Sequence, residues 1–325
     1  MPRKINWESQ IGRRLRLRDL HVFYTVVQHG SMAKAAVQLG VSQPAISEVI
    51  ADLEHALDVR LFDRSSQGVV PTMYGKALLK RSIAVFDELK QSIRDIEFLA
   101  DPTSGEIKIA CSSVIASTVM PHAFERFVKK YPRVVLHFDE MAVASAARNF
   151  PALRDRKYDL ILARGSSLPV DEQLADEFNF DTLFVDQLVI AAGPQSKWAA
   201  RRAKIDLAEL VDGPWIMQVP QTWNYRHLAE AFQARGLAMP RARFVTLSMP
   251  VITHFLADGQ FITAMPRSLV HFNSLKVLPV DLPVRPWPVN IVTLKNRTLS
   301  PVVERFIECA REVTKSIVGL PRKRL

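Results

Sequence analysis

The stretch of sequence that decides the fold is residues 31–64, which read SMAKAAVQLGVSQPAISEVIADLEHALDVRLFDR. Ser31 and Ser42 each precede a segment in which apolar residues recur at helical spacing. A serine at that position is a typical N-cap, because its oxygen accepts a hydrogen bond from a free backbone N–H of the first turn. Gly40 suits the end of the first segment, and Pro44 suits the first turn of the second. The stretch therefore predicts two helices joined by a tight turn.

A further helix is predicted on the N-terminal side, starting at residue 17, from the same three- and four-residue spacing of apolar side chains. The helix that begins at Gln43 carries an apolar stripe, made of Ile46, Val49, Ile50, Leu53 and Leu57. Packed by that stripe on the two preceding helices, it would complete a helix-turn-helix, whose last helix fits a DNA major groove about 12 Å wide. A small helical bundle with no role in DNA binding has the same spacing and is the alternative at this point.

A small β-hairpin is predicted next, with a strand over residues 59–64, turn residues at 65–68 and a returning strand over 69–71. Arg60 and Arg64 lie in this expected wing, where they could contact DNA phosphates. A helix-turn-helix followed by such a wing favours DNA binding.

A long helix is predicted from Met73 to about residue 99, capped by Thr72. At 1.5 Å per residue it would be about 40 Å long. Apolar residues recur along it in a heptad-like seam, at Phe86, Leu89, Ile93, Ile96 and Ala100. A helix with an apolar seam and no domain of its own around it needs a partner, so we expect a homodimer or a homotetramer.

The remainder of the chain alternates strands with helices after a short linker at residues 101–105. The expected strands are 106–111, 134–138 and 159–163, then a second series of 183–192, 215–219, 242–246 and 261–264, with 289–295 and a helix over 302–314 at the end. The first helix of this part is expected to run unbroken from Ser112-Ser113 to residue 132. Repeated strand–helix units predict a mainly parallel sheet with helices on both faces, in two α/β lobes.

Ligands of such sheets bind where the carboxyl ends of strands meet helix N-termini. Six polar residues fall at these junctions: Ser112, Ser113, Arg164, Gln218, Thr222 and Ser248. Hydroxyl groups beside free helix N–H groups can hold a carboxylate, and an arginine can pair with an acid. Simple N-caps for the hydroxyls and a surface ion pair for Arg164 are the alternatives, and Trp223 and Tyr225 are interpreted as packing residues.

Composition narrows the class of protein. The chain has 325 residues, of which 48% are hydrophobic and 23% charged, so it can bury substantial cores and is not disordered in bulk. It has no apolar run of about 18 residues and no apolar signal core at the N-terminus, so we expect a cytoplasmic protein without a membrane partner. The two cysteines, Cys111 and Cys309, suit buried thiols and belong to no disulfide framework or metal cluster.

The net charge of +10 suggests a nucleic-acid partner, because basic side chains release counterions from phosphate. The excess is spread along the chain, since residues 1–100 carry only 14 Lys and Arg against 11 Asp and Glu. Contact with phosphate must then come from placed residues, and the candidates are an arginine arm over residues 13–18 together with Lys34, Arg60 and Arg64.

Motifs of catalysis are missing from the sequence, which has no G-x-S-x-G, no P-loop, no H-E-x-x-H and no G-x-G-x-x-G, while its eight histidines show no metal spacing. We therefore expect neither an enzyme nor a metal or organic cofactor. The competing hypothesis is a solute-binding protein or α/β enzyme whose N-terminal helices merely dimerise it. The two hypotheses differ on whether residues 1–72 bind duplex DNA.

In order and spacing, the N-terminal motifs resemble those of LysR-type transcriptional regulators. The matching stretch is residues 17–79, LRDLHVFYTVVQHGSMAKAAVQLGVSQPAISEVIADLEHALDVRLFDRSSQGVVPTMYGKALL. Its most specific pieces are LGVSQPAIS at residues 39–47 and LFDR at 61–64. The long helix and the size of the C-terminal part also match, so the resemblance extends in architecture to the whole chain. It implies an α/β protein with a winged helix-turn-helix, a dimerising linker helix and a two-lobed effector domain like a periplasmic binding protein.

The resemblance also implies a function: a sequence-specific transcriptional regulator whose DNA contacts and bending are modulated by a small-molecule effector between two lobes. Its implied partners are double-stranded promoter or operator DNA, RNA polymerase and an effector, with carboxylic acids as one candidate class. The residues expected at DNA are Ser31, Lys34, Ser42, Gln43, Pro44, Ser47, Arg60 and Arg64. The expected domains are 1–72 for DNA binding, 73–100 for the linker helix and 101–325 for the effector, with lobe I at about 104–182 and 283–318 and lobe II at about 183–282.

One carboxylate departs from the family pattern, and a second one is expected on the exposed face of the same helix. Glu48 stands where members often have Arg, Lys or Gln, and Glu54 is placed by the helical period on the exposed face of the same helix. A carboxylate is repelled by phosphate, although it can accept from a cytosine amino group. Base readout is therefore assigned to Gln43, Pro44 and Ser47, and the role of Glu48 is open.

Overall fold

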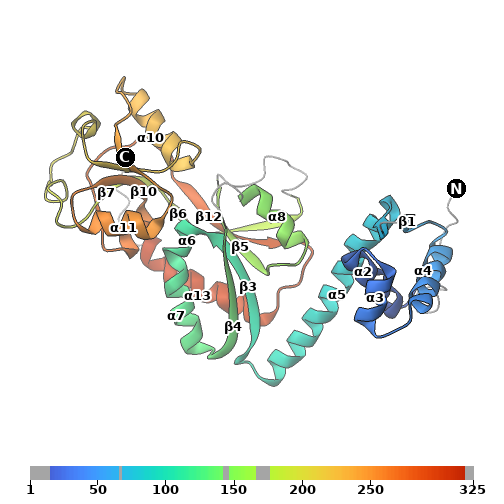
Figure 1. The fold of residues 1–325 in the computed structure, drawn as a ribbon. Helices are drawn as coiled ribbons and strands as arrows, with labels where there is room; N and C mark the ends of the chain where they lie inside the picture. The colour runs from blue at the N-terminus through green and yellow to red at the C-terminus, as the bar shows by residue number, and fades with distance from the viewer. Residues whose placement is uncertain (1–14, 66–67, 142–145, 166–175, 319–325) are drawn as a thin grey trace. The chain divides into compact units, whose positions relative to one another are not determined.

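The computed structural model describes residues 15–65, 68–141, 146–165 and 176–318. The chain divides into two compact units, Met1–Ser92 and Ile93–Leu325. Figure 1 shows one helix, α5, that is continuous across this division.

Three helices form the body of the first unit: α2 (Leu17–His29), α3 (Met32–Leu39) and α4 (Gln43–Leu57). The two serine caps are confirmed, because Ser31 Oγ accepts from the backbone N–H of Lys34 and Ser42 Oγ accepts from that of Ala45, both at 3.4 Å. Gly40 follows α3 in the left-handed conformation, with φ of 65°. The helix-turn-helix is thus built as the local sequence dictates.

The core of this unit lies where the three helices meet. Phe23 and Val26 of α2 are fully buried against Ile46, Ile50 and Leu53 of α4, which are at most 1% exposed. The predicted apolar stripe of α4 is therefore confirmed.

The wing is a hairpin of β1 (Phe62–Ser65) and β2 (Gly68–Pro71), in which Phe62 lies opposite Pro71. The prediction that its first strand begins at residue 59 is wrong. Leu61 and Phe62 are 1% and 3% exposed, so this part of the chain packs into the core before the hairpin starts. A β-carbon at Gly75 would lie 2.2 Å from the Leu61 carbonyl oxygen, which shows how closely the next helix approaches the wing.

The long helix is confirmed as α5 (Met73–Ala100), and Thr72 caps it by accepting the Gly75 N–H at 3.1 Å. Leu89, Ile93 and Ile96 of the predicted seam are exposed, at 42%, 57% and 67%.

Phe86 was expected in the same seam, and this assignment is wrong. Its ring lies against His21 and Tyr24 of α2, with ring centroids 5.8 Å and 6.1 Å apart. Phe86 therefore fastens α5 to its own helix-turn-helix.

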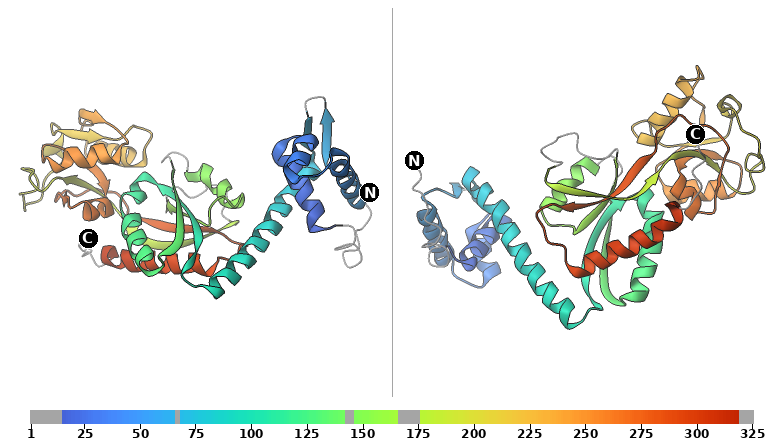
Figure 2. Two further views of the ribbon diagram at one scale, coloured as in Figure 1. Left: turned by 60° about the horizontal axis from the view of Figure 1, so that its bottom comes forward. Right: turned by 180° about the vertical axis from the view of Figure 1, so that it is seen from behind.

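The second unit contains two five-stranded sheets, one in each lobe (Figures 1 and 2). The sheet of lobe I runs in the order β4 (Arg133–Met141), β3 (Ser104–Ser112), β5 (Leu160–Arg164), β12 (Trp287–Leu294) and β6 (Phe178–Asp186). The sheet of lobe II runs in the order β11 (Lys276–Val277), β7 (Leu188–Ala192), β10 (Ile262–Pro266), β8 (Trp215–Met217) and β9 (Ala242–Val245). The α/β class and the two lobes are confirmed.

The mainly parallel sheet that the strand–helix alternation predicts is wrong in detail, because both sheets are mixed. In lobe I, β12 pairs antiparallel with both β5 and β6, and in lobe II, β7 pairs antiparallel with β10. The strands β6 and β12 connect the lobes, which forces their direction. The expected single strand over residues 183–192 is split at Gln187, since its first part belongs to lobe I and its second to lobe II.

Helices cover both faces of the lobe I sheet, as predicted. Helices α7 (Val119–Lys130) and α13 (Pro301–Val318) lie on one face, where Phe127 and Phe306 are in ring contact at 5.4 Å (Figure 2). Helix α8 (Ala146–Arg154) lies on the other. The helix expected to run unbroken from Ser112 is instead split into a short α6 (Ser113–Ala116) and α7.

Lobe II is covered by α10 (Trp223–Gln233), α11 (Met249–Ala257), α12 (Arg267–Phe272) and the short helix η3 (Leu207–Leu210). The two cysteines are buried free thiols, as predicted. Burial and the charge of Glu140 both raise the pKa of the Cys111 thiol, so it is kept protonated.

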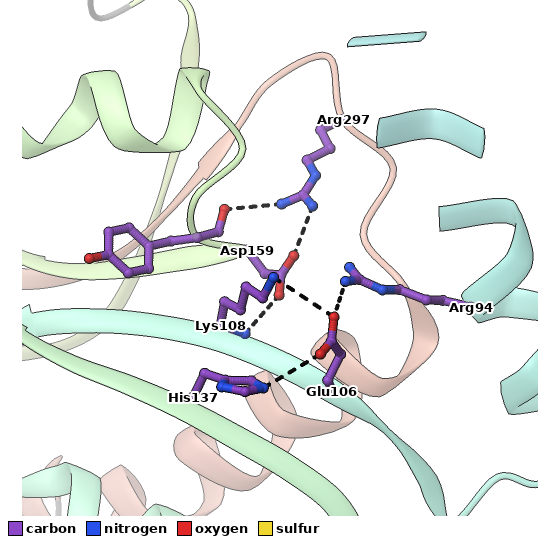
Figure 3. Close-up of polar contacts among 7 residues, drawn as sticks. Arg94, Glu106, Lys108, His137, Asp159 and Arg297 are labelled. Atoms are coloured by element: carbon purple, nitrogen blue, oxygen red, sulfur yellow. Dashed lines mark hydrogen bonds and ion pairs between the residues drawn. The ribbon is translucent and has the colours of Figure 1, made fainter. Parts of the chain in front are cut away.

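The last turns of α5 belong to the effector-side unit. Phe98 packs against its core, and Arg94 pairs with Glu106 of β3. Glu106 also lies 3.8 Å from the Lys108 ammonium and 3.5 Å from the His137 ring nitrogen, so β3 and β4 share this anchor (Figure 3). The end of the long helix is thus fastened to lobe I by charge as well as by packing.

Candidate functional site

The first turn of α4 presents three of the predicted DNA-contacting residues to solvent. Ser42, Gln43 and Pro44 are all exposed. Ser47, one turn further on, is half-buried, and its hydroxyl lies 3.4 Å from the sulfur of Met32 in α3. The outer turn therefore offers an amide and an apolar ring to a base edge, while Ser47 also serves the packing of the two helices.

The predicted cationic contacts are exposed side chains of the same unit. Lys34 and Arg60 are exposed, and the Arg64 side chain is 53% exposed. Of the N-terminal arm, Arg13 and Arg14 lie outside the described residues, whereas Arg16 and Arg18 are exposed. Ser31 is half-buried and acts as the α3 cap.

Glu54 has a role that the helical period did not predict. Its Oε1 accepts hydrogen bonds from the backbone N–H groups of Leu61 at 2.7 Å and Phe62 at 3.2 Å, and its other oxygen lies 3.8 Å from Arg64. The expectation that Glu54 belongs to the exposed face is wrong, because the wing folds back over it. Glu48 is exposed, and its role stays open.

The second candidate site surrounds Arg164, at the end of β5 in lobe I. Its Nη1 donates to Asn224 Oδ1 of lobe II at 3.0 Å. The guanidinium carbon lies over the rings of Trp223 and Trp287, 5.2 Å and 5.0 Å from their centroids. The two indoles contact each other at 4.2 Å, so one aromatic cluster holds the arginine from both lobes.

Electrostatics set Arg164 apart from the surface arginines. Burial lowers its pKa to about 10, against the opposing charge of Asp186. The side chain is half-buried and is still cationic at neutral pH. The alternative of a simple surface ion pair is wrong, because no acid lies within 4.0 Å of this arginine in the described part of the chain.

A cavity of about 300 Å³, including its open mouth, lies beside this arginine. Four of the six predicted effector residues line it: Ser113, Arg164, Gln218 and Thr222. Ser113 and Arg164 come from lobe I and the other two from lobe II, so the structure brings together residues that are far apart in sequence. Thr222 also caps α10 by accepting the Tyr225 N–H at 3.3 Å, so the N-cap interpretation holds for it.

Two of the predicted residues are not on the cavity wall. Ser112 ends β3 and Ser248 precedes α11, but neither lines the cavity. Neither hydroxyl caps its helix.

Trp223 and Asn224 line the cavity and were not chosen from the sequence. Trp223 was interpreted as a packing residue, and it does stack on His227 at 3.9 Å, but it also faces the ligand space. Tyr225 lines a neighbouring cavity of about 200 Å³. The sequence feature that could have identified Trp223 and Asn224 as cavity residues is their position at the start of a helix that follows a strand.

The two units define a class of protein. A winged helix-turn-helix with an exposed reading turn is continuous, through α5, with a two-lobed α/β domain that has a cationic cavity between its lobes. That combination is typical of a DNA-binding regulator that responds to a small ligand.

Comparison with known families makes the assignment specific. Residues 17–76 match the bacterial regulatory helix-turn-helix protein, lysR family, and residues 100–315 match the LysR substrate binding domain. The chain therefore belongs to the LysR family of transcriptional regulators, and its relatives are DNA-binding regulators whose DNA binding is modulated by an effector, not enzymes. The competing enzyme hypothesis is thereby set aside.

Individual relatives agree over nearly their full length. The chain is 26% identical to the transcriptional regulator TdcA of Escherichia coli K12 over 311 residues, covering 94% of this chain and 95% of TdcA. It is 31% identical over 296 residues to YeiE of the same organism, described as an uncharacterized regulator, covering 90% and 96%.

Solved structures show the same fold. A full-length OxyR variant from Pseudomonas aeruginosa is similar with a TM-score of 0.55 and 22% identity, covering 93% of this chain and 95% of that one. A mutant of OxyR from Corynebacterium glutamicum gives a TM-score of 0.52 at 18% identity, with 94% of each chain covered. No helix among the described residues is both long and apolar enough to span a bilayer.

Proposed function

We propose that this regulator reads its operator with the first turn of α4 and responds to a small carboxylate held by Arg164 between the lobes. The DNA contacts proposed are those of Gln43, Pro44 and Ser47 to bases, and of basic residues around them to phosphates. The effector contacts proposed are those of the four cavity residues described above, led by Arg164.

The observation that carries the effector proposal is the hydrogen bonding of Arg164. A guanidinium has five N–H donors, and here only one hydrogen bond is made, to Asn224, within the ranges that the structure describes. The indoles of Trp223 and Trp287 and the side-chain amide of Asn224 hold the guanidinium in place. A half-buried cation with spare donors in a fixed orientation suits a planar anion, which can accept two parallel hydrogen bonds.

The effector proposal is tested by calorimetry with a panel of small carboxylates. Arg164→Gln should weaken binding of a carboxylate by about 10- to 150-fold, since charge-assisted hydrogen bonds contribute about 1.5–3 kcal/mol. Arg243→Gln, at an exposed arginine of β9 outside the cavity, is the matched control and should leave affinity unchanged. Equal affinity in wild type and Arg164→Gln would refute the assignment.

The DNA proposal is tested by mobility shift at several salt concentrations. Gln43→Ala should lose about 1–3 kcal/mol of preference for the operator, whereas Arg60→Ala should weaken binding to all duplexes and reduce the salt slope by about 1. Gln28→Ala, on the exposed side of α2, is the control. Loss of specificity in the control but not in Gln43→Ala would contradict the proposed reading turn.

The remaining parts of the proposal concern assembly and output. Residues 1–72, 73–100 and 101–325 are proposed as the DNA-binding, linker and effector parts, and the exposed apolar seam of α5 as a contact with a second copy. The effector would change the angle between the lobes and, through the linker helices, DNA bending and contact with RNA polymerase in the cytoplasm. Transcription with purified polymerase and an operator template, with and without a bound carboxylate, measures this output.

A further inference from the structure

Helix α6 of lobe I is packed into lobe II. Its residue Val114 is 6% exposed and belongs to a core cluster in which the other members, such as Met249 and Leu269, come from lobe II. The neighbouring helix of lobe II is α12, which runs from Arg267 to Phe272. The lobes therefore have a contact between α6 and α12 in addition to the hydrogen bond between Arg164 and Asn224.

Asn273, the residue that ends α12, joins the ends of these two helices. Its Nδ2 donates to the Leu269 carbonyl of α12 at 2.9 Å and to the Ser117 carbonyl of lobe I at 3.4 Å. Ser117 is in turn the residue that ends α6. A side-chain amide has two N–H donors, so Asn273 can serve a carbonyl in each lobe at the same time.

A ring contact lies beside this hydrogen bond. His122 of α7 in lobe I is stacked on Phe272 of lobe II, with ring centroids 4.6 Å apart and an angle of 28° between the planes. Such pairs add to the stability of a contact beyond the area that they bury. Phe272 also packs against the core, whereas His122 is exposed, so His122 can be replaced without opening a cavity in the core.

The other end of α12 is fixed where the chain crosses between the lobes. Asp186, the last residue of β6, accepts from the Ser268 hydroxyl at 2.5 Å and from the Ser268 backbone N–H at 3.1 Å. The Gln187 carbonyl accepts the backbone N–H of Arg267 at 2.9 Å. A helix of six residues is about 9 Å long, so α12 is a short brace between the crossing and α6.

Ser113 connects this contact to the effector cavity. It is the first residue of α6 and lines the cavity from lobe I. Its carbonyl accepts from the Ser117 backbone N–H at 2.9 Å and from the Ser117 hydroxyl at 2.8 Å. Ser117, His122, Phe272 and Asn273 are not among the described residues that line the cavity. The contact is thus one helical turn away from the cavity wall.

We propose that these four residues, Ser117, His122, Phe272 and Asn273, form a latch that fixes the width of the effector cavity. The latch would hold Ser113 at a set distance from the wall that lobe II supplies. The inference rests on the proposed function, because it assigns positioning residues to the proposed effector site.

The latch is sensitive to the angle between the lobes. A rotation of about 10° at the crossing would displace the far end of α12 by about 1.6 Å relative to α6. The hydrogen bond from Asn273 to Ser117 is already 3.4 Å long, and such a displacement would break it. The latch can therefore stay closed only over a narrow range of angles.

A cavity of fixed width selects its ligand by size. Walls that are held in place before binding spare a compact acid part of the cost of ordering the two lobes. A bulkier acid needs the walls to move apart, and it must then break the latch. The latch should thus favour compact carboxylates over bulky ones, and this preference should decrease when the latch is removed.

The test is calorimetry of the full-length protein with pyruvate, benzoate and 2-naphthoate, three carboxylates of increasing size. Asn273→Ala and His122→Ala should each weaken binding of the smallest acid that binds by about 2- to 12-fold, and should not weaken binding of the largest. His122→Phe keeps a ring on Phe272 and should keep the wild-type preference.

Two exposed residues outside the latch supply matched controls. Asn179→Ala in β6 and His254→Ala in α11 should leave the preference for compact acids unchanged. An unchanged preference in Asn273→Ala and His122→Ala, or an equal loss of affinity for all acids, overturns the inference.

Hydrogen exchange of the protein alone separates this inference from the proposed function. If none of the acids binds, the carboxylate proposal fails, and if fewer than two bind, exchange decides the latch. The backbone amides of Ser117 and Thr118, at the end of α6, should exchange about 2- to 12-fold faster in Asn273→Ala than in Asn179→Ala. Equal rates show that Asn273 does not hold α6 and overturn the inference.

Discussion

Replacement of Glu54 by alanine tests whether this carboxylate holds the wing. Its oxygen is the acceptor for the Leu61 and Phe62 N–H groups, and these residues are at most 3% exposed. Water cannot replace the carboxylate unless the wing opens. A buried donor without a partner costs about 1–3 kcal/mol, so two such donors should lower the local free energy of opening by about 2–6 kcal/mol.

Amide hydrogen exchange measures that local free energy. In Glu54→Ala, the Leu61 and Phe62 amides should exchange about 30-fold faster or more, since each 1.4 kcal/mol corresponds to a tenfold change. Glu54→Gln retains an oxygen acceptor and should lose only about 1 kcal/mol.

Glu48→Ala is the matched control, because Glu48 lies on the same helix and is exposed. Its effect on stability should stay within about 0.5 kcal/mol. Equal exchange rates in Glu54→Ala and Glu48→Ala would refute the wing-anchoring role. Wild-type exchange in Glu54→Ala would do so as well.

Three further outcomes follow from the structure. Ile96→Asp, in the exposed seam of α5, should weaken self-association in analytical ultracentrifugation, whereas Lys90→Asp, off the seam, should not; equal behaviour would contradict the seam. Gly75→Ala should destabilise the wing by about 1–3 kcal/mol in thermal unfolding, since its β-carbon meets the Leu61 carbonyl; unchanged unfolding would rule out the close approach. The pKa of the Asp186 carboxyl group is raised in the folded protein. Its contribution to the free energy of unfolding is therefore present below the ordinary pKa of 3.8 and is lost as pH rises through the folded pKa. Asp186→Asn should flatten this dependence when unfolding is measured at several pH values.

The parts of the fold that were predictable are those decided by neighbouring residues. The caps at Ser31 and Ser42 and the stripe through Ile50 follow from spacing within a few residues, and the structure confirms them. The prediction that Glu54 is exposed is wrong because the start of the wing folds back and donates a hydrogen bond to its carboxylate. The spacing of residues along a helix does not encode that contact.

The effector region shows the same limit on a larger scale. Arg164 could be chosen because it follows a strand, but its two indole neighbours come from distant parts of the chain, at Trp223 and Trp287. Only the pairing of β12 with β5 brings Trp287 close to it. The split of the expected strand at Gln187 had a local signal, since Asp186 and Gln187 interrupt an apolar run, but its meaning as a crossing between lobes depends on the topology.

The anchored end of α5 has a mechanical consequence. With Arg94 and Phe98 fastened to lobe I, a small rotation of that lobe tilts the helix at its base. An α-helix of 28 residues is about 42 Å long, so a tilt of about 5° displaces its far end by about 4 Å. That displacement is close to the rise of about 3.4 Å between successive bases on one DNA strand. We therefore expect that a slight rotation of lobe I, carried by a rigid α5, displaces the far end of this helix by about the spacing of one base.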